Sequence, residues 1–214
     1  MEREIIILAK SSKHGGYCVA GIDTSTGKWI RPISNNAENE GAVPAVDLTY
    51  EDKTQVQVFD KVKIKFSKHI PSKAQPENYE YDDSVYWKKT GESTLQSIIK
   101  DRGYDKPDKI FYNNDRVVAD SEVGGEPSLL LVNIEDSEIF IKTFSDNRKL
   151  QFNFNYNGIE YKFFQISDKE IGKQYSDYSD GAYKLKRNLA VVFSLTDKYQ
   201  MTGKYYKMVA QMFY

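Results

Sequence analysis

The feature that most constrains the fold is an alternation of apolar and polar residues along most of the chain. In the segment VFDKVKIKF, residues 58–66, the apolar Val62, Ile64 and Phe66 alternate with lysines. Successive side chains of a strand point to opposite faces, so this pattern places one set in a core and the other in solvent. Segments with the helical period of 3.6 residues are few. The sequence therefore predicts a mainly β protein.

Helix and turn signals complete this secondary-structure prediction. One helix is predicted over residues 93–103, because Ser93 and Gln96 form a capping box and Gly103 would end the helix. The acidic stretch of residues 35–55 is expected to be mostly loop. Predicted strands span residues 3–9, 16–23, 28–34, 58–66, 128–136, 137–144, 149–156, 159–167, 189–195 and 205–213.

Length and loop signals predict two domains. A chain of 214 residues suits one large domain or two small ones. The segment SEVGGEP is rich in loop-forming residues and marks a boundary near residue 125. In the second half, Asp146-Asn147 and Asn157-Gly158 are turn signals between strands. We therefore expect two small β-barrels, in residues 1–125 and 126–214, the first carrying the acidic loop insertion and the helix.

Composition excludes several classes of protein. The net charge of −1 argues against a polycation that coats DNA through many phosphate contacts. A single cysteine excludes an intrachain disulfide and a multi-cysteine zinc site. No run approaches the roughly 20 apolar residues of a membrane span. The start MEREIIILAK is too short and too acidic for a signal peptide. We expect a soluble cytoplasmic protein with no membrane partner.

Residues suited to catalysis are few. Cys18 lies in a predicted strand, where a cysteine is usually a small buried hydrophobe. His14 precedes the Gly15-Gly16 turn, and no HExxH pattern surrounds it or His69. The segment KHGGYCVAG lies between strands and does not match a nucleotide-binding phosphate loop. The sequence predicts no catalytic residue, no metal site and no cofactor.

Basic residues concentrate in two parts of the first half. Residues 61–75 carry five lysines and neither Asp nor Glu, and the basic residues of the opening strands are opposed by Asp23. The rings of Tyr17 and Trp29 lie among these charges. Lys and Arg offset phosphate charge, while an exposed ring stacks an unpaired base for roughly 1–3 kcal/mol. Alternating lysines are equally the solvated face or the protected edge of a sheet. The basic residues are Lys10, Lys13, Lys28, Arg31, Lys61, Lys63, Lys65, Lys68 and Lys73.

A proline-fixed loop follows the lysine-rich strand. In HIPSKAQPENYEY, Gln75, Glu77 and Asn78 surround Pro76 and can donate or accept hydrogen bonds. Such a loop is a candidate recognition element. It is also a candidate structural turn whose amides bond the backbone, and the sequence leaves both interpretations open.

These segments resemble a known family. ILAKSSKHGGYCVAGID with GKWIRPIS, HIPSKAQPENYEY ahead of YW, and FNYNGIEYKFFQISD with YYKMVAQMF are similar, in this order, to the dual OB-fold domain family of bacterial proteins. The resemblance implies two consecutive OB-like small β-barrels and a presumed nucleic-acid-binding role, linked with bacterial defence or mobile-element systems. It implies no catalytic set.

The resemblance also singles out residues. This chain departs from the pattern after Ser167-Asp168, where Lys169 stands in place of the expected proline. The matching positions are Lys10, His14, Gly15, Gly16, Gly21, Trp29, Arg31, Pro32, His69, Gln75, Pro76, Glu77, Asn78 and Lys207.

The favoured function is a non-catalytic module that binds single-stranded DNA or RNA through a basic and aromatic face of the first barrel. One alternative is a domain that binds a protein partner or senses a small ligand. Another is an enzyme acting on nucleotides or nucleic acid, with a site formed by His14, His69 and Glu77. The predicted nucleic-acid-binding residues are Lys10, Lys13, His14, Tyr17, Lys28, Trp29, Arg31, Lys61, Lys63, Lys65, His69, Gln75 and Asn78.

Overall fold

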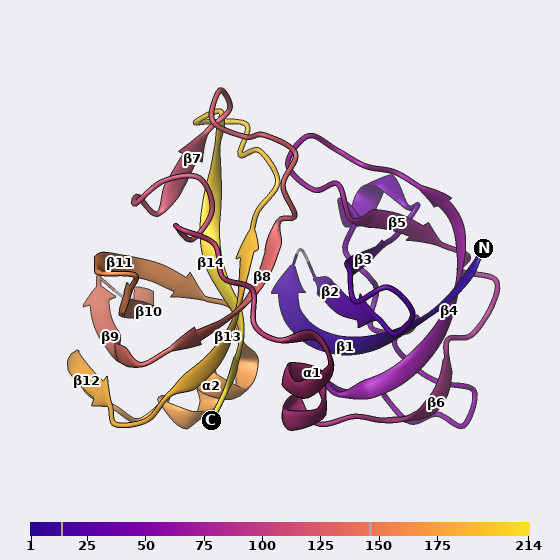
Figure 1. Ribbon diagram of the computed structural model, residues 1–214, viewed down its shortest axis with the longest axis horizontal. Helices are drawn as coiled ribbons and strands as arrows, with labels where there is room; N and C mark the ends of the chain where they lie inside the picture. The colour runs from indigo at the N-terminus through magenta and orange to yellow at the C-terminus, as the bar shows by residue number, and fades with distance from the viewer. Residues whose placement is uncertain (14, 146) are drawn as a thin grey trace. The chain divides into compact units, whose positions relative to one another are not determined.

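The computed structural model describes residues 1–13, 15–145 and 147–214 (Figure 1). The chain divides into two compact units, Met1–Gly103 and Tyr104–Tyr214. Each unit is built around strands, and the described residues contain two α-helices. This confirms the prediction of a mainly β protein.

The first unit is a closed five-stranded barrel. Its strands follow the order β1-β2-β3-β5-β4, and β4 pairs with β1 to close the ring. β6 adds to the outer edge of β4. β3 and β5 are parallel, whereas the other pairs are antiparallel. The strands are β1 (Glu2–Lys13), β2 (Gly16–Asp23), β3 (Trp29–Ile33), β4 (Asp60–His69), β5 (Asn78–Tyr81) and β6 (Lys88–Glu92).

β1 can belong to both sides of the ring because it is long and irregular. Its first half pairs with β4 and most of its length pairs with β2, with a register shift between Ile7 and Ala9. Gly21 on β2 allows the two backbones to approach closely, since a Cβ there would lie 2.4 Å from the Ile6 carbonyl oxygen. Ile5 and Ile7 of β1 join Val62 and Ile64 of β4 in the buried core, as the alternation predicts.

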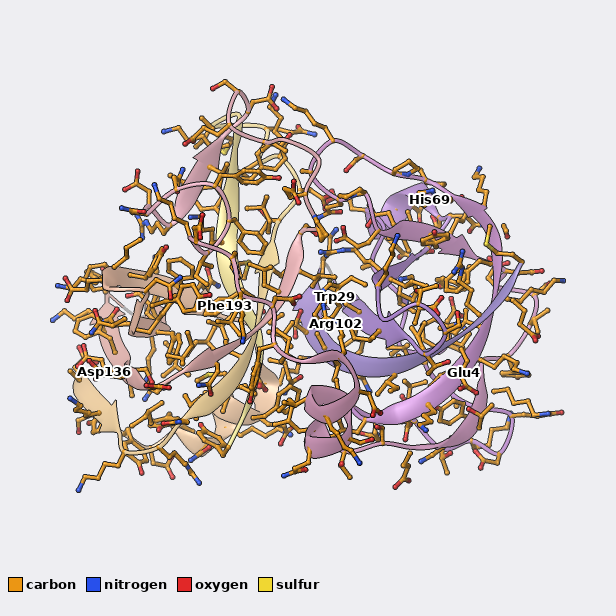
Figure 2. The ribbon with its side chains drawn as sticks, viewed as in Figure 1. Glu4, Trp29, His69, Arg102, Asp136 and Phe193 are labelled. Atoms are coloured by element: carbon orange, nitrogen blue, oxygen red, sulfur yellow. The ribbon has the colours of Figure 1, made fainter. Side chains whose placement is uncertain are left out.

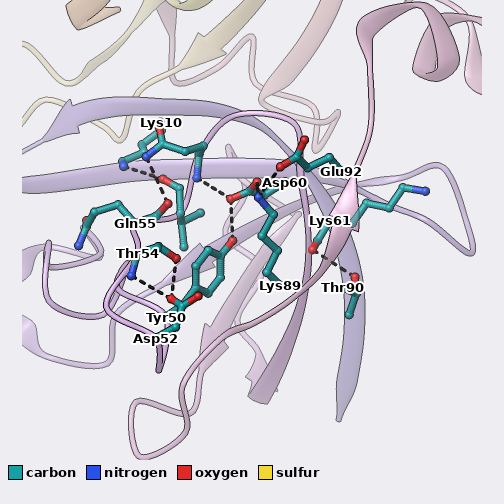
Figure 3. Close-up of polar contacts among 12 residues, drawn as sticks. Lys10, Tyr50, Asp52, Thr54, Gln55, Asp60, Lys61, Lys89, Thr90 and Glu92 are labelled. Carbon is teal, nitrogen blue, oxygen red and sulfur yellow. Dashed lines mark hydrogen bonds and ion pairs between the residues drawn. The ribbon is translucent and has the colours of Figure 1, made fainter.

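The acidic segment between β3 and β4 is mostly irregular, as expected, with a short 3-10 helix η1 (Ala37–Asn39). It nevertheless contributes Val43, Leu48, Tyr50 and Val56 to the core of the first barrel. Its attachment is polar: the Tyr50 hydroxyl donates to Asp60 Oδ2 at 2.8 Å (Figure 3). Other contacts join the segment to β1, and β4 to β6. Lys10 Nζ donates to the Val56 carbonyl at 2.7 Å, and Lys89 Nζ lies 2.7 Å from Asp60 Oδ1.

Helix α1 (Leu95–Arg102) forms where the sequence predicts a helix, with a different cap. Thr94, not Ser93, is the N-cap, and its hydroxyl accepts from the Ser97 backbone N–H at 3.1 Å. The cap therefore lies one residue later than expected, and Gln96 stands at the second helical position and not at the third, which a capping box needs. Gly103 ends the helix at a φ of 80°, a conformation that glycine adopts without strain.

The second unit repeats this strand order. Its sheet runs β9-β10-β11-β14-β13-β8, and Glu135 alone separates the end of β8 from the start of β9. β8 and β9 thus act as one bent strand that pairs at both ends, as β1 does in the first unit. β11 and β14 are parallel, like β3 and β5. The strands are β7 (Val117–Ala119), β8 (Leu129–Ile134), β9 (Asp136–Phe144), β10 (Asn147–Tyr156), β11 (Ile159–Ile166), β12 (Gly181–Leu185), β13 (Leu189–Leu195) and β14 (Lys204–Phe213).

The turn and helix signals of the second half have mixed outcomes. Asn157 and Gly158 both have positive φ and join β10 to β11 as predicted. Asp146, in the other predicted turn, lies outside the described residues. Helix α2 (Lys169–Gln174) is capped by Asp168, so Lys169 is its first residue. A proline is well tolerated at the first position of a helix, which accounts for the proline expected there.

The segment before β8 belongs by its contacts to the second unit. β7 pairs with β14, and the Asp105 backbone N–H donates to the Leu131 carbonyl at 2.8 Å. The buried Lys207 donates to the Phe111 carbonyl and to two oxygens of Asn113 at 2.7–2.9 Å, and its burial lowers its pKa to about 7. The compact units therefore divide at Gly103, ahead of residue 125, and a domain boundary near residue 125 stays a prediction.

Candidate nucleic-acid interface

The lysines of β4 alternate outward as predicted, but they do not form an unopposed basic face. Lys63 lies 3.6 Å from a Glu2 carboxylate oxygen, and Lys65 lies 2.8 Å from Asp82. Lys68 lies 3.4 Å from Glu80. The hydrogen bond from Lys65 is the main cause that lowers the pKa of Asp82 to about 2. These acids are distant in sequence, so the absence of Asp and Glu within residues 61–75 gave no sign of them.

β1 and β6 also border these lysines. Glu2 and Glu4 stand opposite Lys65 and Lys63 in the β1–β4 register. Lys61, half-buried, stands opposite Gly91 of β6. The strand is therefore a charge-balanced outer face, which corrects the expectation of a basic surface centred on β4.

Trp29 is buried, with 6% of its surface exposed, so its ring is not available to stack a base. The Arg102 guanidinium lies 5.6 Å from the ring centroid, and Arg102 Nε donates to the Gly27 carbonyl at 2.8 Å. Figure 2 shows Trp29 and Arg102 together, away from His69. Lys28, the preceding residue, is exposed. The sequence prediction of an exposed Trp29 is thus corrected: α1 provides the cation that covers it.

Arg31 is also buried and acts as an anchor between elements. Its Nη2 lies 3.3 Å from Glu77 Oε1, and its Nη1 lies 3.0 Å from the sulfur of Cys18. Its backbone N–H donates to the Glu77 carbonyl at 2.9 Å. One side chain thereby joins β2, β3 and the loop between β4 and β5. Because it is enclosed, Arg31 is not placed to reach a phosphate from the surface, contrary to the sequence prediction.

The loop of residues 70–77 is held by its own amides. Asn78 Nδ2 donates to Gln75 Oε1 at 3.0 Å, and the Gln75 N–H donates to Ser72 Oγ at 3.0 Å. Gln75 and Asn78 are buried, and Asn78 Oδ1 has no hydrogen-bond partner within the described part of the chain. Of the two interpretations of this loop, the structural turn accounts for these contacts. We call residues Cys18, Arg31, Gln75, Glu77 and Asn78 the Arg31 cluster.

Several predicted site residues do reach the surface of the first barrel. Lys10 lies 5.1 Å from the centroid of the partly exposed Tyr17 ring. His69 stacks on Tyr79 with centroids 4.3 Å apart. His69 Nε2 lies 2.7 Å from the Pro76 carbonyl oxygen, an acceptor only, which makes Nε2 the protonated nitrogen. Lys13 is half-buried, and His14 lies outside the described residues.

The contacts of the proposed acid–base residues are structural. Glu77 is enclosed with Arg31, and His69 holds the Pro76 carbonyl. Within residues 1–13, 15–145 and 147–214, no group of three or more His, Cys, Asp or Glu side chains is arranged to hold a metal ion. In the same residues no helix has the length and apolarity needed to cross a membrane.

The outer face of the second barrel, where Phe144 and Phe163 are exposed, is not among the sites predicted from the sequence. Both belong to strands that were predicted, and their neighbours Lys142 and Lys149 are basic. The alternation that places Ile139 and Ile141 inside also places Phe140 and Phe144 outside. That signal could have found this face.

Comparisons with known proteins give a family and a distant structural neighbour. A solved structure of a murine DNA-binding protein bound to double-stranded DNA aligns with 100% of this chain and 96% of that chain. The identity is 9% and the TM-score 0.37, values too low to carry an argument about fold or function. No curated protein matches the chain. The family model of the dual OB-containing domain matches residues 3–212. The chain therefore belongs to the dual OB-containing domain family.

Proposed function

We propose that this protein is a non-catalytic module that binds single-stranded DNA or RNA. OB barrels bind oligonucleotides on the face of their second and third strands and through the loops that follow the first and fourth strands. In the first barrel these are β2, β3, the β1–β2 turn and the loop of residues 70–77. The family resemblance suggests a bacterial defence or mobile-element setting for this activity, and the composition suggests a cytoplasmic location.

The observation that carries the proposal is the Arg31 cluster. Arg31 contacts Cys18 near the start of β2 and Glu77 at the end of the loop of residues 70–77, so this strand and this loop are tied to one buried centre. Fixed loops lose little conformational entropy on binding, which favours affinity. Arg31 itself would then position the surface and would not contact the ligand.

The ligand-contacting residues would come from the two loops. Lys13, at the end of β1, and Lys73, exposed in the loop of residues 70–77, would offset phosphate charge. Tyr17 and His69 would present rings to unpaired bases. Lys10, whose ammonium lies 5.1 Å from the centroid of the Tyr17 ring, would help to hold that ring in place. Lys61, Lys63 and Lys65 would lie outside the contact, because the lysines of β4 are charge-balanced or half-buried. Lys28, between β2 and β3, belongs to neither loop and would also lie outside it.

The test is a titration of labelled single-stranded DNA and RNA by fluorescence anisotropy at several salt concentrations. Wild type should bind with an affinity that falls with salt. Lys13→Glu and Lys73→Glu should each weaken binding and make the log–log salt slope shallower by roughly 0.7. Lys100→Glu, the same charge change on the exposed end of α1, is the matched control and should leave the slope unchanged. Absence of salt-dependent binding by wild type would refute the proposal.

A protein partner is the second candidate function. Met201 is 85% exposed in the loop between β13 and β14, beside the exposed Tyr199. Exposed methionine next to an aromatic ring suits an adaptable protein contact. Binding to a protein with no measurable affinity for either nucleic acid would favour this candidate.

A further inference from the structure

We infer that the outer face of the second barrel stacks unpaired bases of a single-stranded nucleic acid. This deepens the proposed function, because it assigns a second surface, on the other barrel, to the same class of ligand. The surface lies on the β9–β10–β11 part of the second sheet (Figure 1). We call it the Phe163 face, and its residues are Phe140, Lys142, Phe144, Lys149, Gln151 and Phe163.

The face combines three aromatic rings on β9 and β11, the two strands that flank β10. Phe144 is 55% exposed and Phe163 is 40% exposed. Phe140, on β9, is half-buried. The Phe140 and Phe163 rings meet edge to face, with centroids 5.4 Å apart. The inward residues of the same strands, such as Ile141 and Phe152, are fully buried. The core of the barrel is therefore complete without the outer rings, which are left to contact something else.

A bulge in β11 holds Phe163 outward. The β10–β11 register shifts between Phe152 and Phe154, and Phe163 has a φ of 62°. A left-handed conformation is unfavourable for a bulky residue and is kept where the surroundings enforce it. Here the buried Asn153 enforces it, because its Oδ1 accepts from the Phe163 N–H at 2.8 Å. Bulges of this kind redirect a side chain next to a functional site.

The charges of the face favour an anion. Lys142 and Lys149 stand directly opposite each other in the β9–β10 register. Like charges in this position repel each other, and a bound phosphate would relieve the repulsion. Asp180 approaches Lys142 at 3.8 Å, while Lys149 forms no ion pair within the described residues and lies 5.9 Å from the Phe144 ring centroid. A lysine next to an exposed ring can contact the phosphate of the nucleotide whose base stacks on that ring.

The first barrel lacks such a face among its described residues. On its second and third strands, Ala20, Ile22 and Trp29 are buried, and Arg31 is enclosed in its cluster. The second and third strands of the second barrel leave Phe163 and Gln165 exposed, with Gln151 half-buried beside them. Gln151 Nε2 donates to the Phe163 carbonyl at 3.3 Å, and a side-chain amide can also accept a hydrogen bond from a base edge through its oxygen. A stacking face on the strands is therefore assigned to the second barrel, in addition to the rings of Tyr17 and His69 near the loops of the first.

The rings favour single strands over duplexes, because a paired base has both faces covered by its neighbours and cannot stack on Phe144 or Phe163. A protein partner would also bury these rings, but the opposed lysines would then need acidic residues on that partner. The titration below separates these occupants.

The experiment uses the full chain and a single-stranded oligonucleotide that carries a fluorescent adenine analogue quenched by stacking. Phe144→Ala and Phe163→Ala should each weaken binding roughly 5- to 100-fold and reduce the quenching, with the salt slope unchanged. Phe163→Trp should keep the affinity and the quenching of wild type. The control is Tyr86→Ala, because Tyr86 is 57% exposed with Lys53 5.7 Å from its ring centroid, and it should bind like wild type.

The outcomes distinguish this inference from the proposed function. If wild type binds and the two phenylalanine variants bind equally well with full quenching, the Phe163 face is overturned while the proposed function stands. Equal binding of duplex and single strand overturns base stacking on this face. If wild type binds no nucleic acid at all, both proposals fall. Circular dichroism spectra that match wild type show that each variant is folded.

Discussion

At the scale of single residues, Arg31 shows how one buried cation can hold three elements. It contacts Cys18, Glu77 and the backbone carbonyl of Glu77, and it is enclosed with them. Removing one partner of a buried ion pair leaves the other charge uncompensated, whereas an exposed pair adds little. This chain contains a buried pair, Arg31 with Glu77, and an exposed pair, Lys63 with Glu2.

We therefore expect Arg31→Ala to lower the free energy of unfolding by about 3–5 kcal/mol. Lys63→Ala, which breaks the exposed contact with Glu2, should change it by less than about 1 kcal/mol. Urea unfolding followed by tryptophan fluorescence measures both, since Trp29 lies in the same barrel. Equal effects of the two substitutions would contradict the anchoring role of Arg31.

At the scale of elements, the start of α2 explains a departure from the family pattern. Asp168 is the N-cap with an extended backbone (φ −69°, ψ 115°), and its Oδ1 accepts from Glu170 N–H at 2.9 Å. A residue before proline favours this conformation, and the first helical N–H has no partner within the helix. A proline at position 169 would fit both conditions.

We expect Lys169→Pro to be tolerated or to stabilise the second barrel by about 0.4–1 kcal/mol, through a more restricted unfolded chain. Glu170→Pro, one residue further on, should destabilise it, because it removes the N–H that bonds Asp168. Thermal unfolding of the two variants beside wild type gives the comparison. A loss of stability in Lys169→Pro equal to that in Glu170→Pro would be evidence against this account of the helix start.

The length of a strand decides whether the sequence predicts it. Long alternating segments such as residues 58–66 and 137–144 predict their strands, because one face is buried and the other is not. The sequence does not predict the short strands β5, β6, β7 and β12. Three to five residues are too few to show a clear alternation of apolar and polar side chains. The surface of β4 could not be predicted, since its counter-charges come from β1, the residues after β5 and β5 itself.

At the scale of the whole molecule, the two units have their own barrels with the same strand order. The resemblance on which the sequence analysis relied therefore identified the fold correctly. The candidate site was harder to predict, because Trp29 and Arg31 have the residue types of a binding surface and yet are buried. Burial of a charged or aromatic side chain depends on contacts distant in sequence, here with Arg102 and Glu77.

The position of the division between units can be tested with fragments. We expect residues 104–214 to fold alone and to unfold cooperatively. Residues 126–214 should be much less stable, because they lack β7 and the oxygens of Phe111 and Asn113 that solvate the buried Lys207 ammonium. Circular dichroism during thermal unfolding compares the two fragments. Equal stability would instead place the domain boundary near residue 125.

The charge balance of β4 has a consequence for how fast a ligand is captured. Each of Lys63, Lys65 and Lys68 has a carboxylate beside it, so their combined potential fades over a distance much shorter than the ~10 Å Debye length of a dilute salt solution. A polyanion approaching the β4 face is then not steered from afar, and encounters on this face occur at the ordinary rate of unguided diffusion. Added salt should shorten the lifetime of a complex and leave its rate of formation almost constant.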